Sequence, residues 1–246
     1  ERARHDPGHI ETTATKDGNG FRLSGKKRFV SCGMGADAFI VAAKTEDGAT
    51  NLFLVDAQAQ GLSRTGRRTV DSHMPADIVF DDVKLDGDAL MNGADNAQLA
   101  LDHALDVGRA CLAAESLGVG EQAFADTIEY LKGREQFGAP IGAFQGLQHR
   151  AAHLLGELEL ARSLVMKALR TLDEQPSQAS MWCAAAKAKT CQVSRLAAAE
   201  GIQMFGGVGM TDEYDIGLYY KRAQAAGEHL GDEMWGSGRV AGMLGM

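Results

Sequence analysis

Two short strings of this sequence carry the residue types that hold a large, anionic and aromatic ligand. The first reads REQFG over 134–138 and is followed by Gln145, and the second reads QMFGGVG over 203–209. An Arg next to a Phe offers a phosphate clamp beside a stacking face. Side-chain amides and glycine backbone N–H groups satisfy phosphate oxygens or an adenine edge. Together the strings predict a nucleotide-like cofactor site.

The glycines of the second string do not form a Rossmann loop. Such a loop follows a strand and opens a helix, whereas Gly206-Gly207-Val208-Gly209 follows a predicted helix. A simple helix stop is the plainer interpretation. For the first string, the plainer interpretation is a solvated Arg134 and a core Phe137. Taken one string at a time, these alternatives stay open.

Two other sets of polar residues recur at helical spacing. His149, His153 and Glu157 fall on one predicted helix face, a spacing that suits zinc. The zinc-protease pattern needs a Glu directly after the first His, where this chain has Arg150. We therefore expect a solvated, partly salt-bridged face and no metal. Asp106 and Arg109, one turn apart, predict an ion pair on an exposed helix face.

The elements that must position these residues change type along the chain. Short β-rich runs separated by Gly, Asp and Asn fill the first part and predict an antiparallel sheet or small barrel. Ser24-Gly25 reads as a hairpin turn between two of them. The predicted strands are Phe21–Leu23, Lys27–Val30, Ala38–Ala43, Leu52–Val55 and Ile78–Val83.

Beyond a turn-rich segment at 86–95, the apolar positions follow a helical period. Long helices with short connections predict an antiparallel bundle. The predicted helices are Asn96–Lys132, Gln145–Glu174, Gln178–Phe205, Ile216–Arg222 and Asp232–Leu244. The fold class is therefore α+β, with an antiparallel β-domain over 1–88 followed by an antiparallel four-helix bundle over 89–246.

Composition limits the classes of function. The 246 residues carry a net charge of -8 and are 45% hydrophobic, which predicts a sizeable core and disfavours general nucleic-acid binding. No apolar run is long enough to span a membrane. None of the four cysteines forms a CxxC pair, so we expect free, buried thiols in a reducing cytoplasm.

The two strings resemble, in residue identity and spacing, the C-terminal half of the acyl-CoA dehydrogenases, which are flavoproteins. The segment over 25–31, GKKRFVS, also resembles the family's Gly-x-Lys-x-(Trp/Phe)-Ile-(Thr/Ser). The resemblance covers nearly the whole chain. It implies the middle β-domain and the C-terminal helical bundle of that family, without its N-terminal helical domain.

The resemblance implies an FAD site shared between subunits. Phe29 is expected to pack on the isoalloxazine and Ser31 to hydrogen-bond near flavin N5. Asp106 and Arg109 are the implied acyl-CoA contacts. A shared cofactor implies a homodimer or homotetramer, or a heteromer, with an electron-transfer flavoprotein as electron acceptor. The implied cofactor residues are Phe29, Ser31, Arg134, Phe137, Gln145, Gln203, Phe205, Gly206 and Gly207.

The family reaction needs a carboxylate to remove the α-proton of the thioester. The two positions at which the family carries this base correspond to Gly108 and Leu230. Neither is acidic. Glu228 and Asp232 are the nearest acids and become the candidate bases, with ordinary surface carboxylates as the alternative.

Two functions follow from the resemblance. The first is FAD-dependent α,β-dehydrogenation of an acyl-CoA thioester. The second is a flavin-binding but non-catalytic partner subunit of a heteromeric acyl-CoA dehydrogenase, which the missing base favours. A flavin oxidase or monooxygenase on the same fold would need oxygen reactivity that the sequence does not show. A purely structural bundle leaves the two strings unexplained.

Overall fold

A computed structural model describes residues 5–91 and 96–246 of the chain. The contacts divide it into two compact units, Glu1–Ala104 and Leu105–Met246. We call them the β unit and the helical unit and describe each by itself. The division falls within the first long helix, whose first turns belong to the β unit. The mixed sheet-plus-helix fold class is confirmed.

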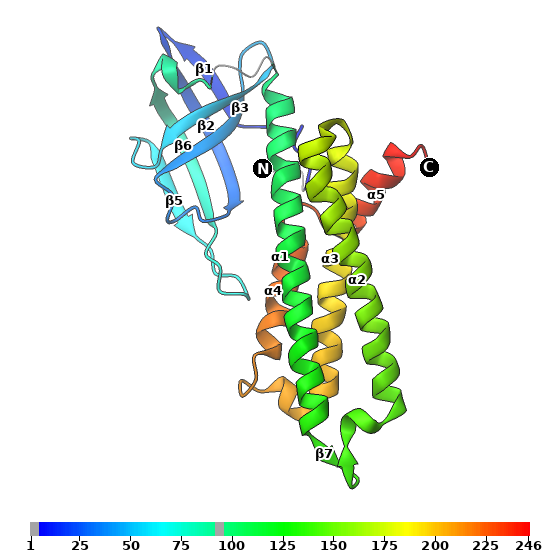
Figure 1. Ribbon diagram of the computed structural model, residues 1–246. Helices are drawn as coiled ribbons and strands as arrows, with labels where there is room; N and C mark the ends of the chain where they lie inside the picture. The colour runs from blue at the N-terminus through cyan, green and yellow to red at the C-terminus, as the bar shows by residue number, and fades with distance from the viewer. Residues whose placement is uncertain (1–4, 92–95) are drawn as a thin grey trace. The chain divides into compact units, whose positions relative to one another are not determined.

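The β unit contains a six-stranded sheet in the order β4-β3-β1-β2-β6-β5 (Figure 1). β1 pairs parallel with β3, and the other described pairs of this sheet are antiparallel. Its apolar core includes Leu23, Phe53, Val55 and Ile78, which are fully buried. The strands are β1 (Thr13–Asp17), β2 (Gly20–Val30), β3 (Ala38–Lys44), β4 (Thr50–Asp56), β5 (Leu62–Gly66) and β6 (Ala76–Leu85), followed by a 3-10 turn η1 (Gly87–Ala89).

The predicted hairpin at Ser24-Gly25 is wrong, because β2 passes straight through it as one strand. Gly25 has φ +147, and a Cβ at this position would lie 2.7 Å from Thr12 Cα. Glycine is therefore needed for a close approach between backbones and not for a turn. The polar strands β1 and β5 were not predicted, since neither carries an apolar alternation.

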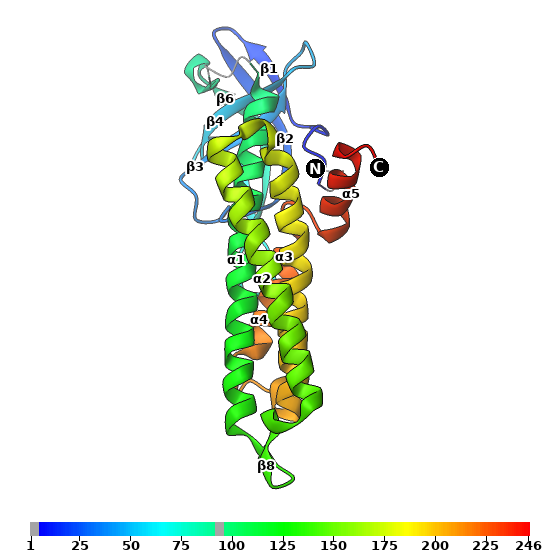
Figure 2. The ribbon, with the colours of Figure 1, turned by 45° about the vertical axis from the view of Figure 1, so that its right-hand side comes forward.

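The helical unit contains the predicted long helices, and Figures 1 and 2 show α1, α2 and α3 running side by side. Its core is rich in alanine, which lets the helices approach closely, with Leu154, Leu158 and Ile216 among the larger buried side chains. The helices are α1 (Ala97–Gly133), α2 (Gln145–Glu174), α3 (Pro176–Phe205), α4 (Ile216–Glu228) and α5 (Glu233–Met243).

The ends of these helices have local causes. α2 has the predicted bounds, and α3 begins at Pro176 because proline fits the first turn of a helix, where its missing N–H costs nothing. α4 runs six residues beyond the predicted Arg222, to Glu228. Short elements connect the helices: β7 (Glu135–Gln136), β8 (Ala139–Pro140), η2 (Ile141–Ala143) and η3 (Gly206–Met210).

The sequence predicts no membrane-spanning helix and four buried cysteines. Within residues 5–91 and 96–246, no helix combines the length and apolarity that a bilayer crossing requires. Cys183 and Cys191 are buried as expected, but Cys32 and Cys111 are exposed. Cys111 lies on α1 at a helix position that faces outward, which an apolar neighbourhood in sequence does not reveal.

Candidate functional site

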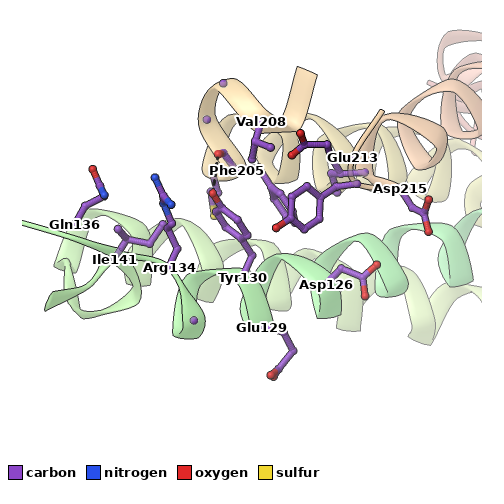
Figure 3. Close-up of a pocket in the computed structure, with 16 residues that line it drawn as sticks. Asp126, Glu129, Tyr130, Arg134, Gln136, Ile141, Phe205, Val208, Glu213 and Asp215 are labelled. Atoms are coloured by element: carbon purple, nitrogen blue, oxygen red, sulfur yellow. Dashed lines mark hydrogen bonds between the residues drawn. The ribbon is translucent and has the colours of Figure 1, made fainter. Parts of the chain in front are cut away.

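The helical unit holds a cavity of about 1260 Å³ where the end of α1 faces the end of α3 (Figure 3). Both sequence strings reach it. Arg134 and Gln136 line it from the first string, and the second contributes a continuous run over 204–208. The structure therefore brings together two segments that lie about seventy positions apart in the chain.

The first string is positioned by the end of α1 and a tight hairpin. The Arg134 N–H donates to the Tyr130 carbonyl at 2.9 Å, and the Arg134 carbonyl accepts from the Ile141 N–H at 2.8 Å. β7 and β8 pair between these points. Phe137 lies in the turn with φ 57 and is 94% exposed. The expectation of a core Phe137 is wrong, because a turn of this kind projects the ring outward.

The second string is positioned by the end of α3. Gly206 has φ 70, a conformation that costs L-residues free energy and ends the helix. The predicted helix stop is thus confirmed. A Cβ at Gly206 or Gly207 would meet no atom within 4 Å. The backbone here faces open space, so a ligand can approach it closely.

Tyr130 joins the two strings, and sequence reasoning missed it. Its ring stacks on Phe205 with centroids 4.1 Å apart and 12° between planes, and its hydroxyl donates to the Phe205 carbonyl at 3.2 Å. Tyr214 meets the same Phe205 ring edge-on at 5.0 Å. The one signal available was the spacing of Tyr130, one helical turn before Arg134.

The charges of the cavity are unevenly distributed. Figure 3 shows Arg134 towards one end and Asp126 and Asp215 towards the other. Tyr219 donates to Asp126 at 2.8 Å; burial and this bond raise the pKa of the Tyr219 phenol to about 12. The side chain of Arg134 has no hydrogen bond or ion pair within the described residues.

The charges of the cavity suit different parts of an FAD molecule at different places. A pyrophosphate is favoured only at the Arg134 end, where the guanidinium lies. Hydroxyl and amino donors suit the acidic end. The stacked rings between the two ends offer an apolar wall.

The remaining predicted cofactor residues lie elsewhere. Gln145 is the first residue of α2, and Gln203 is an exposed residue in the last turn of α3. Within the described residues, neither these amides nor Phe137 line the cavity. Phe29 and Ser31 belong to the β unit, at and just after the end of β2. Phe29 is 53% exposed and has φ 53.

Asp106 and Arg109 form the predicted ion pair, at 2.8 Å, but the expectation of an exposed face is wrong. Both side chains are buried. Arg109 also donates through Nε to the Leu230 carbonyl at 2.9 Å and lies over the Trp235 ring, 4.4 Å from its centroid. Leu230 and Trp235 cover Arg109 and bury it. They lie more than a hundred positions further along the chain, so the local sequence does not reveal this burial.

Gly108 and Leu230, the two positions at which the resemblance led us to expect the base, meet in space. A Cβ on Gly108 would lie 2.9 Å from Leu230 Cδ1. Leu230 has φ 58, so its backbone is held in the left-handed region. Glu228 is the last residue of α4, and Asp232 caps α5 by accepting the Trp235 N–H at 2.8 Å. Sequence reasoning named all four residues but could not place them together.

A buried lysine holds the turn that carries Leu230. Lys187 of α3 is fully buried, and its Nζ donates to the carbonyls of Ala226 at 2.9 Å, Gly227 at 3.3 Å and Gly231 at 2.9 Å. The first two carbonyls lie at the end of α4, where a cation is favourable, and the Ala226 carbonyl also accepts from the His229 N–H at 3.2 Å. Burial lowers the pKa of Lys187.

The histidine-bearing face of α2 forms ordinary surface contacts. Glu157 pairs with Lys189 of α3, whose bond lowers the pKa of the Glu157 carboxyl. This matches the expected salt-bridged face.

Comparison with known proteins decides the family. The domain description "Acyl-CoA dehydrogenase, C-terminal domain" matches residues 98–233, and "Acyl-CoA dehydrogenase, middle domain" matches residues 1–83. This chain belongs to the acyl-CoA dehydrogenase family.

Three relatives within the acyl-CoA dehydrogenase family illustrate the match. The short-chain-specific acyl-CoA dehydrogenase of Megasphaera elsdenii is 30% identical over 87% of this chain and 58% of its own length. The caffeyl-CoA reductase-Etf complex subunit CarC of Acetobacterium woodii is 27% identical over 98% of this chain and 65% of its own. The crystal structure of the ChsE4-ChsE5 complex from Mycobacterium tuberculosis superposes with a TM-score of 0.87 and 28% identity, over 98% of this chain and 65% of that one. The chain thus spans less than two thirds of the length of each.

Proposed function

We propose that this chain serves the FAD-dependent α,β-dehydrogenation of an acyl-CoA thioester as a flavin-holding subunit, while another chain supplies the proton-abstracting carboxylate. The contact between Gly108 and Leu230 carries the proposal. An α-proton next to a thioester is weakly acidic, so its removal needs a positioned carboxylate in a dry pocket. Both positions of that carboxylate are apolar here and touch each other.

The cavity beside Arg134 supports the flavin-holding half of the proposal. Arg134 would bind the pyrophosphate, and the open backbone at Gly206 and Gly207 would approach the same phosphates or the ribose. Phe137, Gln145 and Gln203 lie exposed near the ends of the same helices and would extend the contact. When bound, FAD supplies a hydride acceptor for the β-hydrogen.

Arg109 would hold the thioester-facing side of the turn. Its guanidinium is fixed by Asp106 and by the Leu230 carbonyl, so it orients the turn more than it offers a free charge. In a dry pocket this arrangement excludes water, and its one carboxylate, Asp106, is held in the ion pair with Arg109.

The relatives support an assembly of more than one chain. CarC is by name part of a complex with Etf, and the ChsE4-ChsE5 complex names two components. We propose a similar heteromer for this chain, with an electron-transfer flavoprotein as electron acceptor and the cytoplasm as its location. A homodimer or homotetramer would have glycine and leucine at the two expected base positions of every subunit.

An anaerobic titration tests the proposal. The full chain is loaded with FAD and titrated with a panel of acyl-CoA thioesters while flavin absorbance is followed. We expect bound flavin that is not bleached by any thioester and is bleached by dithionite. Bleaching by an acyl-CoA would contradict the division of labour, and failure to bind FAD would contradict the flavin-holding role.

A second candidate is turnover by this chain alone, with Glu228 or Asp232 as base. Their position on either side of Leu230 favours it. The N-cap bond of Asp232 argues against it, because a base would have to leave the helix end. If the wild-type chain does bleach, Glu228→Gln and Asp232→Asn identify the base by abolishing the reaction.

A further inference from the structure

β2 carries a β-bulge directly before Ser31. Lys27 pairs with Ile78 and Val30 pairs with Ala76, so Arg28 and Phe29 together face a single residue of β6, Asp77. A bulge interrupts the ladder of backbone hydrogen bonds and re-aims the side chains beside it.

The bulge turns Phe29 away from the core. Along β2, Leu23 is buried and Lys27 is partly buried, and strict alternation would place Phe29 on the same face. Instead Phe29 is 53% exposed, and Val30 packs against the core. The φ of 53 at Phe29 is a conformation that bulky L-residues adopt only when their surroundings impose it.

Asp77 provides that surrounding. The residue is 3% exposed, and its Oδ1 accepts the Phe29 N–H at 3.3 Å in place of a ladder carbonyl. Oδ2 accepts from Arg67 Nη2 at 2.6 Å and lies 3.9 Å from Arg28 Nε. The hydrogen bond from Arg67 lowers the pKa of the Asp77 carboxyl, so the carboxylate stays charged and accepts more strongly.

The far side of the segment is also fixed. Arg64 Nη1 donates to the carbonyls of Gly33 at 3.3 Å, Met34 at 3.2 Å and Ala36 at 3.1 Å. The segment that contains Phe29 and Ser31 is thus held on one side by the Asp77 carboxylate and on the other by the Arg64 guanidinium.

We propose that Asp77 is a positioning residue that holds Phe29 in its left-handed, outward conformation for the flavin site. The contact by which Asp77 holds Phe29, called the hold below, rests on the bulge geometry. The purpose of the hold, which is to place Phe29 at the flavin, rests on the proposed function. The step from Phe29 to Asp77 had no sequence signal, because the two lie 48 positions apart.

The hold is tested on the full chain without cofactor, by NMR of the Phe29 amide. In Asp77→Ala we expect the amide proton to move upfield and to exchange at least about tenfold faster, since a bond to a charged acceptor is lost. Asp81→Ala is the matched control, on the same strand with an exposed side chain, and should leave the amide unchanged. An unchanged Phe29 amide in Asp77→Ala would overturn the hold.

A second variant covers the possibility that Asp77→Ala does not fold. Asp77→Asn keeps the Oδ1 acceptor and the shape but cannot titrate. In the wild type, the Phe29 amide shift should follow an acidic titration below the usual range of an aspartate; in Asp77→Asn that titration should disappear. Its persistence would overturn the assignment of the contact to Asp77.

The purpose is tested separately by titrating FAD and following flavin fluorescence. Phe29→Ala and Asp77→Ala should each change the response, and the double variant should change it no further than Phe29→Ala, because Asp77 acts through Phe29. A wild-type response in both single variants, with the amide perturbed as expected, overturns the flavin purpose and leaves the hold standing.

Discussion

Leu230 lies against Gly108, close enough that a Cβ on the glycine would come within 2.9 Å of Leu230 Cδ1. Two positions 122 residues apart in the chain therefore share one small volume. The family resemblance leads us to expect the base at one or the other of these positions, and a single carboxylate at either would occupy the same place. This chain fills that place with an isobutyl group and a hydrogen atom.

Replacing Leu230 by glutamate should therefore create a base. In Leu230→Glu the carboxylate enters a turn already fixed by Arg109 and Lys187, so we expect acyl-CoA to bleach the flavin of the FAD-loaded chain. Leu230→Gln has the same length and cannot accept the proton, so it should not bleach. Equal behaviour of the two variants would mean that residue 230 does not face the reacting carbon.

Removing the Arg134 guanidinium should weaken FAD binding. A charge-assisted bond to phosphate contributes about 1.5 to 3 kcal/mol, which corresponds to roughly tenfold to a hundredfold in Kd. Flavin fluorescence quenching of Arg134→Ala measures it. Lys132→Ala is the control two residues earlier, where the lysine pairs with Glu129 in solvent. If both variants bind FAD equally, Arg134 does not contact the phosphates.

Replacing Lys187 by methionine should destabilise the helical unit. The change removes the ammonium that donates to three buried carbonyls, of which Ala226 keeps the His229 N–H, and we expect a loss of about 2 to 4 kcal/mol in the free energy of unfolding. Urea denaturation measures it. Lys189→Met, on the same helix, breaks only a partly exposed pair with Glu157 and should cost about 1 kcal/mol or less. Equal midpoints for the two would contradict the role of Lys187.

The cysteines should differ in reactivity. Burial, and then the Asp106 charge, raise the pKa of the Cys183 thiol to about 12. At pH 8 only about one thiol in ten thousand is then ionised, whereas Cys32 and Cys111 are exposed. Iodoacetamide followed by peptide mass spectrometry should label the exposed pair first. Labelling of Cys183 at the rate of Cys111 would contradict its burial.

The same raised pKa fixes the sign of a pH effect. The folded state favours the neutral thiol, so its contribution to stability is present below the unfolded pKa and is lost as pH rises above it. Cys183→Ala should remove this alkaline loss of stability, as followed by thermal unfolding at a series of pH values. A wild-type pH dependence in this variant would assign the loss to other groups.

Periodicity predicted the helices well, because α1, α2 and α3 bury residues at a helical spacing, many of them apolar. It also placed Gly206 at a helix end, since a glycine in the left-handed region stops a helix wherever the rest of the fold lies. The sheet was less predictable. Gly25 suggested a turn, but glycine is required there because Thr12 on a neighbouring segment approaches it closely, which no local pattern contains.

The site was predictable only where its residues are close in sequence. Arg134 and Gly207 were identified from their own strings. The ring of Tyr130 that connects them, the Asp77 carboxylate beneath Phe29, and the contact of Leu230 with Gly108 all depend on tertiary packing. The burial of Arg109 was missed for the same reason, since its partner Leu230 comes from the far end of the chain.

Exchange of the α-protons of an acyl-CoA with solvent tests the central claim most directly, because it reports on the base alone. The FAD-loaded chain is incubated with a saturated acyl-CoA in D2O, and the deuterium content of the recovered thioester is measured by mass spectrometry. We predict no deuterium incorporation with the wild-type chain and incorporation at the α-carbon with Leu230→Glu. Incorporation by the wild-type chain would contradict the account, because it would require a base within this chain.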